Sequence, residues 1–380
     1  MHCYLSTSHY ILPFLHIPTF LVVSLFIFFF TRIFIKGYIF SLLLLSQDYS
    51  NPQKWGEPGF AAFIVAICCL ASRHIDDPRV KAHPNDGISA GAQWYDLFKR
   101  LQIHPIADQP TLYNIQANLI AAAYTVGLGR TSRAAALLAE SVTMCIDAGL
   151  HRSADSYNHF DPVENEVRKR TFWCVYIWDK QLGAHFGRPS LLRLRDCDVG
   201  EPTPVDDDYI TREAIVTPPP GKECSMSAFL VLLRIMVVLE SVLEVPPACE
   251  SDRSDSFLLR ATNVLYGMRE YRPMREEALL DEIHQKIPAH WAHSPETLAS
   301  EDKIRITQAE RLHCAEQFVR LLIHRHRFSD YFAERMYGLR GEEQTDAERE
   351  ALIAAHGAAL QVISAHVNIA HQGLMTYCER

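Results

Sequence analysis

Residues 161–189, DPVENEVRKRTFWCVYIWDKQLGAHFGRP, decide how the rest of the chain is expected to fold. Asp161 can cap a helix, Pro162 suits its first position, and Glu164 stands where a capping-box carboxylate reaches back. Residues 172–178 are apolar without interruption, and a surface helix would not be apolar on all sides for two turns. The stretch therefore predicts a helix with a charged entrance and a buried middle, which ends at its Gly-Arg-Pro exit because proline cannot continue a helix.

A basic triplet lies near the entrance of this helix. Glu164 stands four residues before Arg168, and Glu166 stands four residues before Arg170, which is the favourable order for helix ion pairs. One reading is that Arg168, Lys169 and Arg170 contact phosphate or an acidic partner. The other is that they form a solvated helix face paired with the two glutamates. Charge blocks on helices usually have this second role, so we expect the solvated face.

Apolar spacing also predicts helices on both sides of the central one, at 59–72, 91–103, 111–126, 132–148, 226–244, 254–270, 303–337 and 345–371. Gly149 supplies a left-handed stop for the helix at 132–148, and Leu150 is the hydrophobic partner of that stop. In this helix Ile146 is expected to face inwards. The helices at 111–126 and 132–148 form a hairpin against which the central helix packs. Because alternating strand patterns are nearly absent, the predicted fold class is all-α, a multi-helix domain with helical hairpins and negligible strands.

Composition limits the function classes. The 380 residues are 48% hydrophobic and 22% charged, which suits one large or two ordinary globular domains. The net charge of −8 lacks the basic excess that is typical of a nucleic-acid-binding domain. The ten cysteines include no C-x2-C pair, so a structural zinc site is not expected. Their scatter through apolar helices favours a reducing compartment over a disulfide framework.

Changes in composition along the chain predict the domain boundaries. Residues 1–56 are an irregular apolar segment, in which 11–45 is long enough to be a transmembrane candidate but lacks the features of a signal peptide. Residues 57–200 and 226–380 are the two helical halves. Between them, 201–225 is rich in proline and acidic residues, which predicts a linker or a long surface loop.

Several motifs, in this order and at this spacing, resemble the regulatory domain of fungal zinc-cluster transcription factors, the fungal-specific transcription factor domain. They correspond to the family's G-L-H-R turn, its E-x-R-R-R-x-F-W helix continuing as Y-x-x-D-R, and its G-R-P exit. The residues that carry this likeness are treated as structural positions: Gly149, Leu150, His151, Arg152, Glu166, Arg168, Arg170, Trp173, Tyr176, Asp179, Gly187, Arg188 and Pro189. Residues 322–325, LIHR, resemble a late helix motif, so the likeness covers roughly 57–340.

Two residues depart from the family pattern in this helix. Lys169 and Lys180 stand where the family usually has arginine, so they keep the charge but lose the planar fork for bidentate pairing. The exit keeps the family pattern. Arg188, fixed by Pro189, is expected to bond back to the preceding carbonyls or to Asp179.

The resemblance implies an all-α regulatory module that controls RNA polymerase II transcription in the nucleus through a signal or a partner, without catalysis. The implied partners are transcriptional co-regulators and a second copy of the chain in a homodimer. Zinc and DNA contact belong to the family's six-cysteine cluster, and nothing in residues 1–60 matches it. We therefore expect no cofactor in this chain. The sequence looks like a regulator without its DNA-binding head, or like part of a longer protein.

The apolar N-terminal segment has two interpretations. Residues 12–20, LPFLHIPTF, resemble the family's opening L-P-x-L-H-R-P-T-F, after which the family continues with a polar helix. One hypothesis is therefore that 21–46 is a gene-model artefact, such as a translated intron. The alternative is a membrane-anchored all-helical protein that uses 11–45 as its anchor.

Other residues suggest a ligand site or catalysis less strongly. Trp173, Tyr176 and Trp178 could line an effector pocket, but core packing is the expected role of such aromatics.

A second alternative is a metal-dependent helical enzyme, in which Glu310-x-x-His313 or Asp281-x-x-His284 supplies ligands. A di-iron bundle requires two E-x-x-H motifs and two further glutamates. His324 and His326 are two residues apart and face different sides of a helix. No nucleophile elbow, P-loop or dinucleotide motif is present, so we assign no catalytic, metal or cofactor residues and do not expect an enzyme.

Overall fold

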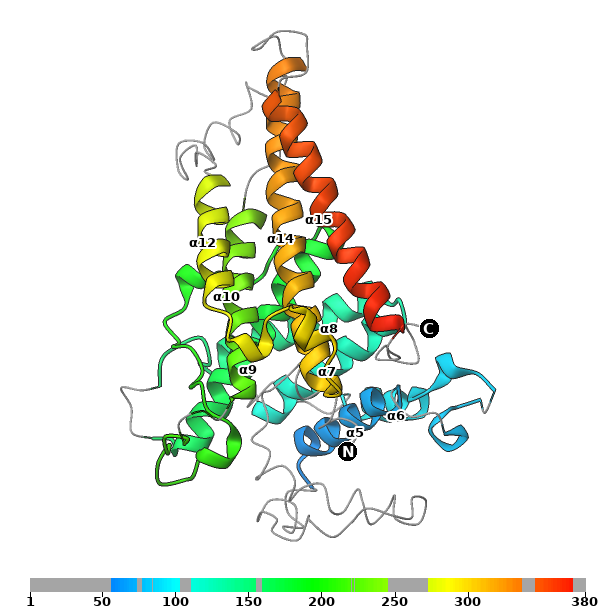
Figure 1. Cartoon of the computed structure of the whole chain (residues 1–380). Coiled ribbons are helices and arrows are strands. Elements are labelled where there is room, and N and C mark those ends of the chain that lie inside the picture. The colour runs from blue at the N-terminus through cyan, green and yellow to red at the C-terminus, as the bar shows by residue number, and fades with distance from the viewer. Residues whose placement is uncertain are drawn as a thin grey trace, which may run out of the picture. The chain divides into compact units, whose positions relative to one another are not determined.

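The computed structural model describes residues 56–73, 77–83, 85–102, 111–154, 159–219, 221, 223–244, 273–336 and 346–371. Ten α-helices occur in these ranges, and the extended pairing found there is limited to two isolated bridges, Lys81–Ala90 and Ile210–Ile215 (Figure 1). The predicted all-α fold class is confirmed. The chain divides into two compact units, Met1–Leu230 with Leu374–Arg380, and Val231–Gly373.

Among its described residues, the first unit contains five complete helices: α5 (Pro58–Ser72), α6 (Ala92–Leu101), α7 (Leu112–Gly127), α8 (Thr131–Asp147) and α9 (Pro162–Phe186). α7 packs against α5 and α8, and α9 packs against both α7 and α8. Phe60 and Phe63 of α5 lie against Tyr113 of α7, with ring centroids 5.2 and 5.3 Å away. The predicted hairpin of α7 and α8 is therefore present, and the central helix lies on it as predicted.

The helix ends of the first unit follow from local sequence. Asp161 caps α9 by accepting the Glu164 N–H at 2.8 Å. Gly149 adopts φ +68° after α8, where the Leu150 N–H bonds to the carbonyl of Cys145 at 2.9 Å, as in a Schellman motif. Leu150 is buried, as predicted. Ile146 is exposed, so its inward prediction is wrong.

α9 is the central helix of this unit. Residues 171–177 are all buried, which explains why the apolar run has no polar face. Thr171, at the start of the run, accepts a hydrogen bond from Gln116 of α7 at 2.9 Å between buried side chains. Gly187 ends the helix at φ +63°, a left-handed conformation that glycine adopts without Cβ strain. The helix therefore ends at this glycine, two residues before the proline.

The second unit contains most of α10 (Ser225–Leu243), followed by α12 (Pro273–Gln285), α13 (Pro295–Leu298), α14 (Lys303–Met336) and α15 (Asp346–His371). α14 and α15 run side by side, orange and red in Figure 1. α12 packs on α14, and the Ser241 hydroxyl of α10 donates to Glu276 of α12 at 2.8 Å.

Some predictions concern residues outside the described ranges, namely the helix at 254–270, the anchor at 11–45 and the artefact at 21–46. They stay predictions, as does the domain division at 201–225. Among the described helices, α10 is long and apolar enough to cross a membrane by length and composition. Two thirds of its apolar window, 67%, is buried inside the protein, and core helices pass the same test.

Candidate functional site

One stripe of α9 holds the chain segment 200–210 that follows it. Val163, Glu166, Arg170 and Trp173 are three or four residues apart, so they lie on one face of the helix. At one end of the stripe, Val163 joins Val205 and Ile210 in a small hydrophobic cluster. At the other end, the indole N–H of Trp173 donates to the carbonyl of Gly200 at 2.8 Å. The stripe therefore combines apolar packing at one end with polar bonds along the rest, all to the segment 200–210.

Arg170 lies at the centre of this stripe and is about 1% exposed, the largest of the fully buried side chains in the described chain. Its Nε donates to Glu166 Oε1 at 3.0 Å, and its Nη1 donates to Asp207 Oδ1 at 2.5 Å. Its Nη2 reaches the carbonyl of Val205 at 3.4 Å. All three nitrogens of the buried guanidinium thus have acceptors, as a buried cation requires.

Glu166 connects the same cluster to Thr203. Its Oε1 accepts the backbone N–H of Thr203 at 3.0 Å, and its Oε2 accepts the Thr203 hydroxyl at 3.1 Å. Glu166 and Asp207 are both buried. We call these four residues, Glu166, Arg170, Thr203 and Asp207, the buried charge cluster. It fixes the position of 203–207 on α9 through directional bonds.

The electrostatics of the cluster keep the arginine charged. Burial alone would lower the pKa of Arg170, but the negative charges of Asp207 and Glu166 and the bonds to them offset this effect, so its pKa is raised. With two carboxylates and one guanidinium, the ionised groups sum to one negative charge. Such a buried group stabilises the fold only while it is complete, because removing one partner leaves a buried charge without compensation.

The expectation of a solvated basic face is wrong for two members of the triplet. The predicted Glu166–Arg170 pair exists, but it is buried instead of solvated. Arg168 donates to the carbonyl of Ala148 at the C-terminal end of α8, at 2.9 Å, and its guanidinium lies 4.2 Å from the Phe160 ring centroid. A cation at a helix C-terminus is favourable, so this arginine joins α9 to α8.

Sequence reasoning missed Asp207 and Thr203, which lie in the stretch expected to be a linker or surface loop. The available signal was the place of Arg170 on the same stripe as Trp173, which predicts burial. An arginine is almost never fully buried without a partner, so a second carboxylate had to come from elsewhere in the chain. The sequence does not say which of the three consecutive aspartates at 206–208 supplies it.

Asp179 and Lys180 hold the chain just after the helix exit. Asp179 accepts the backbone N–H groups of Leu191 and Leu192, both at 3.0 Å. Lys180 bonds to Asp179 at 3.2 Å and to the carbonyl of Leu192, and its ammonium lies 4.7 Å from the Tyr176 ring centroid. Both charged side chains are buried. Together they fasten residues 191–192 to the last turns of α9.

The structure changes the expected role of Arg188. Its side chain is exposed, and Asp179 is bonded to the amides of Leu191 and Leu192. The backbone N–H of Arg188 bonds to Gly183 at 3.1 Å, so the link to a preceding carbonyl is made by the main chain. Pro189 is exposed as well.

The turn after α8 is bonded to Asp198, in the stretch of chain that follows α9. The carbonyl of His151 accepts the N–H of Asp198 at 3.1 Å, and Arg152 forms an exposed ion pair with the Asp198 carboxylate at 3.9 Å.

The aromatic residues of α9 pack in the core: the rings of Trp173 and Tyr176 are buried and meet edge to face at 5.2 Å. Trp178 is half-buried.

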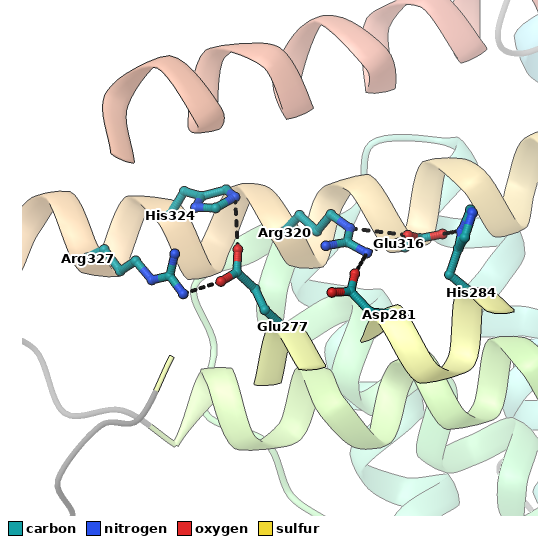
Figure 2. A network of polar contacts seen from close by, with 7 residues as sticks. All are labelled: Glu277, Asp281, His284, Glu316, Arg320, His324 and Arg327. Carbon is teal, nitrogen blue, oxygen red and sulfur yellow. Dashed lines mark hydrogen bonds and ion pairs between the residues drawn. The ribbon is translucent and has the colours of Figure 1, made fainter. Parts of the chain in front are cut away.

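A second polar network joins α12 and α14 in the other unit. Glu277, Asp281 and His284 of α12 face Glu316, Arg320, His324 and Arg327 of α14 in one line (Figure 2). Arg320 bonds to Asp281 at 2.7 Å and to Glu316 at 2.9 Å. Glu277 pairs with both His324 and Arg327. We call these seven residues the α12–α14 ladder.

The metal motifs of the sequence are occupied by other contacts. His284 bonds to Glu316 at 2.9 Å. His313 stacks on His293 at 4.1 Å between ring centroids, and Glu310 lies 3.2 Å from His293. Over the ranges that the structure describes, no group of three His, Cys, Asp or Glu side chains is placed to hold a metal ion.

Comparison with known proteins agrees with the motif order. The sequence profile of the fungal specific transcription factor domain matches residues 1–263, which is more than half of the chain. The chain belongs to this family. The match begins earlier than the expected likeness over 57–340 and ends before α12. Residues 161–189, with the buried charge cluster on α9, lie inside it.

Curated relatives are fungal regulators of transcription. An uncharacterized transcriptional regulatory protein of Schizosaccharomyces pombe is 27% identical over 167 residues, 43% of this chain and 20% of the relative. In Saccharomyces cerevisiae, pyrimidine pathway regulatory protein 1 is 31% identical over 113 residues, 28% of this chain and 12% of the relative. Activator of stress genes 1, also from Saccharomyces cerevisiae, is 29% identical over 171 residues, 44% and 17% of the two chains.

The chain thus matches no more than a fifth of the length of these three relatives. No solved structure matches it. The family and the names of these relatives associate this domain with the regulation of transcription.

Proposed function

We propose that the chain is the regulatory module of a zinc-cluster type regulator, acting in the nucleus on RNA polymerase II transcription without catalysis of its own. The observation that supports this proposal is the buried charge cluster. The charged signature residues Glu166, Arg170 and Asp179 of α9 bind the chain's own backbone and side chains, so they position a segment of the chain.

The mechanism that we propose is a change in packing. α9 holds 191–192 through Asp179 and Lys180, and it holds 203–207 through Glu166 and Arg170. A co-regulator or small effector that favours one arrangement of residues 191–207 would alter the surface that the first unit presents. Because the bonds between these buried polar groups are directional, we expect the segment to change between discrete arrangements.

DNA contact is assigned to a separate zinc-cluster head, since the chain carries a net charge of −8. Proteins that bind DNA through phosphate contacts need a basic surface, and their affinity falls steeply with salt. Filter binding of the chain alone at low salt should show little retention of duplex DNA. Tight, salt-sensitive binding would contradict this part of the proposal.

A reporter assay tests the regulatory role. The whole chain is fused to a bacterial DNA-binding domain, and transcription is measured from a promoter that carries the matching operator. We expect output that differs from that of the DNA-binding domain alone, and loss of the difference in Arg170→Ala. The matched control Arg188→Ala removes an exposed arginine and should keep the difference, with immunoblots confirming equal protein levels. Output equal to the bare DNA-binding domain in wild type would overturn the proposal.

Cell fractionation separates the proposal from the membrane-anchored alternative. A soluble or nuclear pool supports the regulator. A carbonate-resistant membrane pellet supports an anchor at 11–45.

A further inference from the structure

α15 has two apolar faces, and its alanine face packs inside the protein. Ala351, Ala355, Ala358 and Ala365 are buried, and α15 packs along α14. Alanines at such spacing let two helices approach closely. This face accounts for how α15 is held in its unit.

The opposite face of α15 carries large apolar side chains that are exposed in the described part of the chain. Ile353 is 63% exposed, Leu360 66%, Ile363 59% and Val367 46%. Their spacings of seven, three and four residues are those of positions a, a, d and a in a heptad repeat, the pattern of a coiled-coil seam. We call these four residues the α15 seam. They are a third of the twelve exposed large hydrophobic residues in the described chain.

The seam lies in an uncharged stretch. Residues 351–371 contain no aspartate, glutamate, lysine or arginine, although the five residues before them, DAERE, contain four. A helix face that stays in water normally carries charge, and an exposed apolar face rimmed by polar residues is typical of an interaction site. The uncharged stretch therefore indicates a face that is covered in the working protein.

We propose that the α15 seam pairs with the α15 seam of a second copy of this chain. A two-fold axis brings the same patch of both copies together, so the uncharged stretch meets itself and no ion loses its water. A partner with a charged face would lose that hydration without forming an ion pair. The second copy thus matches the seam in both spacing and charge.

The neighbours of the seam permit close approach. Gly357 and Ser364 occupy the flanking e positions of the same heptad frame, and the space beyond Gly357 is open. Small residues at such positions let helix backbones come together. The seam runs from Ile353 to Val367, fifteen residues or about 22 Å of helix.

The expected interface is small. Four large side chains per copy with their small neighbours bury on the order of 1,000 Å² in total, which is the low end for specific contacts. Association is therefore expected to depend on concentration. A dimer of modest stability suits a contact that forms when a regulator is brought to adjacent sites.

Analytical ultracentrifugation of the whole chain tests the pairing. We expect a monomer–dimer equilibrium in wild type and a dissociation constant at least about tenfold higher in Leu360→Glu, because each copy would bury a carboxylate. Ile88→Glu is the matched control, since Ile88 is 70% exposed and lies in the other unit. This control should dimerise like wild type.

If Leu360→Glu fails to fold, the dissociation constant is measured with the second variant Ile353→Glu instead. Circular dichroism should show unchanged helix content in every variant that is compared. A wild-type chain that stays monomeric at its highest soluble concentration would overturn the proposal. A dimer that both seam variants leave unchanged would do the same, as would a monomer that uses the seam for a different protein. The reporter fusion measures the transcriptional role independently, so the two proposals can fail separately.

Discussion

The buried charge cluster of α9 and the α12–α14 ladder use the same chemistry in different surroundings. In each, an arginine pairs with a glutamate four residues earlier on its own helix and with an aspartate from another segment. In the cluster, Arg170 and both carboxylates are buried. In the ladder, the carboxylate of Asp281 is 59% exposed and Arg320 is 20% exposed.

The difference shows that burial sets how much a charge pair matters. Exposed pairs contribute little because water screens them and would solvate either partner if the other were removed. A buried pair has no such replacement, so loss of one partner is costly even where the complete pair adds little net stability. We therefore expect the family signature to act on folding chiefly through the cluster.

Arg170→Ala should give the largest effect. It leaves Glu166 and Asp207 buried without their cation, so unfolding free energy should fall by about 3–5 kcal/mol. Urea denaturation followed by circular dichroism measures this loss. The exposed Arg188→Ala is the control and should stay within about 0.5 kcal/mol of wild type. Equal losses in the two variants would show that burial is not the deciding factor.

Thr203→Val should give the next effect. The change keeps the side-chain shape but removes the hydroxyl that bonds to Glu166 Oε2, and hydrogen bonds to charged groups contribute about 1.5–3 kcal/mol. Thr143→Val is matched to it, because the Thr143 hydroxyl bonds to a carbonyl of its own helix at an exposed site. The same denaturation experiment should show little change for this control. A larger loss in Thr143→Val would contradict the comparison.

The Asp281–Arg320 pair of the ladder should couple weakly. A double-mutant cycle with Asp281→Ala and Arg320→Ala should give a coupling energy of about 0.2–1 kcal/mol, as for exposed pairs. The same cycle on Asp207 and Arg170 should give a value several times larger. Similar coupling energies at both sites would remove the distinction between them.

The smallest effect concerns pH and His324 of the ladder. Burial lowers the pKa of His324 below its usual 6.5; Glu277 opposes this shift, and Arg327 and Arg320 add to it. At His324 the unfolded chain therefore binds more protons in this range, so the contribution of His324 to stability is fully present above pH 6.5 and is lost as the pH falls below it. Burial lowers the pKa of His313 and His326 as well, which acts in the same direction.

His324→Asn should flatten this decline when melting temperatures are compared between neutral and mildly acidic buffers. The readout is the change of melting temperature with pH, because the substitution can also shift stability by the same amount at every pH. A variant with the wild-type slope would show that His324 does not contribute.

Much of the fold could be read from local patterns. The start of α9 at Asp161, the glycine stop at Gly149 and the hairpin of α7 and α8 depend on neighbouring residues and on apolar spacing. Ile146 shows the limit of that reading: its apolar character suits a core, yet its angle around α8 turns it to solvent. An apolar residue at the edge of a helical stripe cannot be placed until its neighbours are known.

The sequence by itself determined an all-α chain, the central position of α9 and its family, because helix periodicity and motif order are local properties. The tertiary structure decided what the charged signature residues do. It turned an expected solvated face into a buried charge cluster by bringing Asp207 and Thr203 to Arg170 and Glu166 across about forty residues of chain. The stripe of α9 indicates that Arg170 is buried, but which distant segment packs on it and supplies its second carboxylate is not contained in the helix's own sequence.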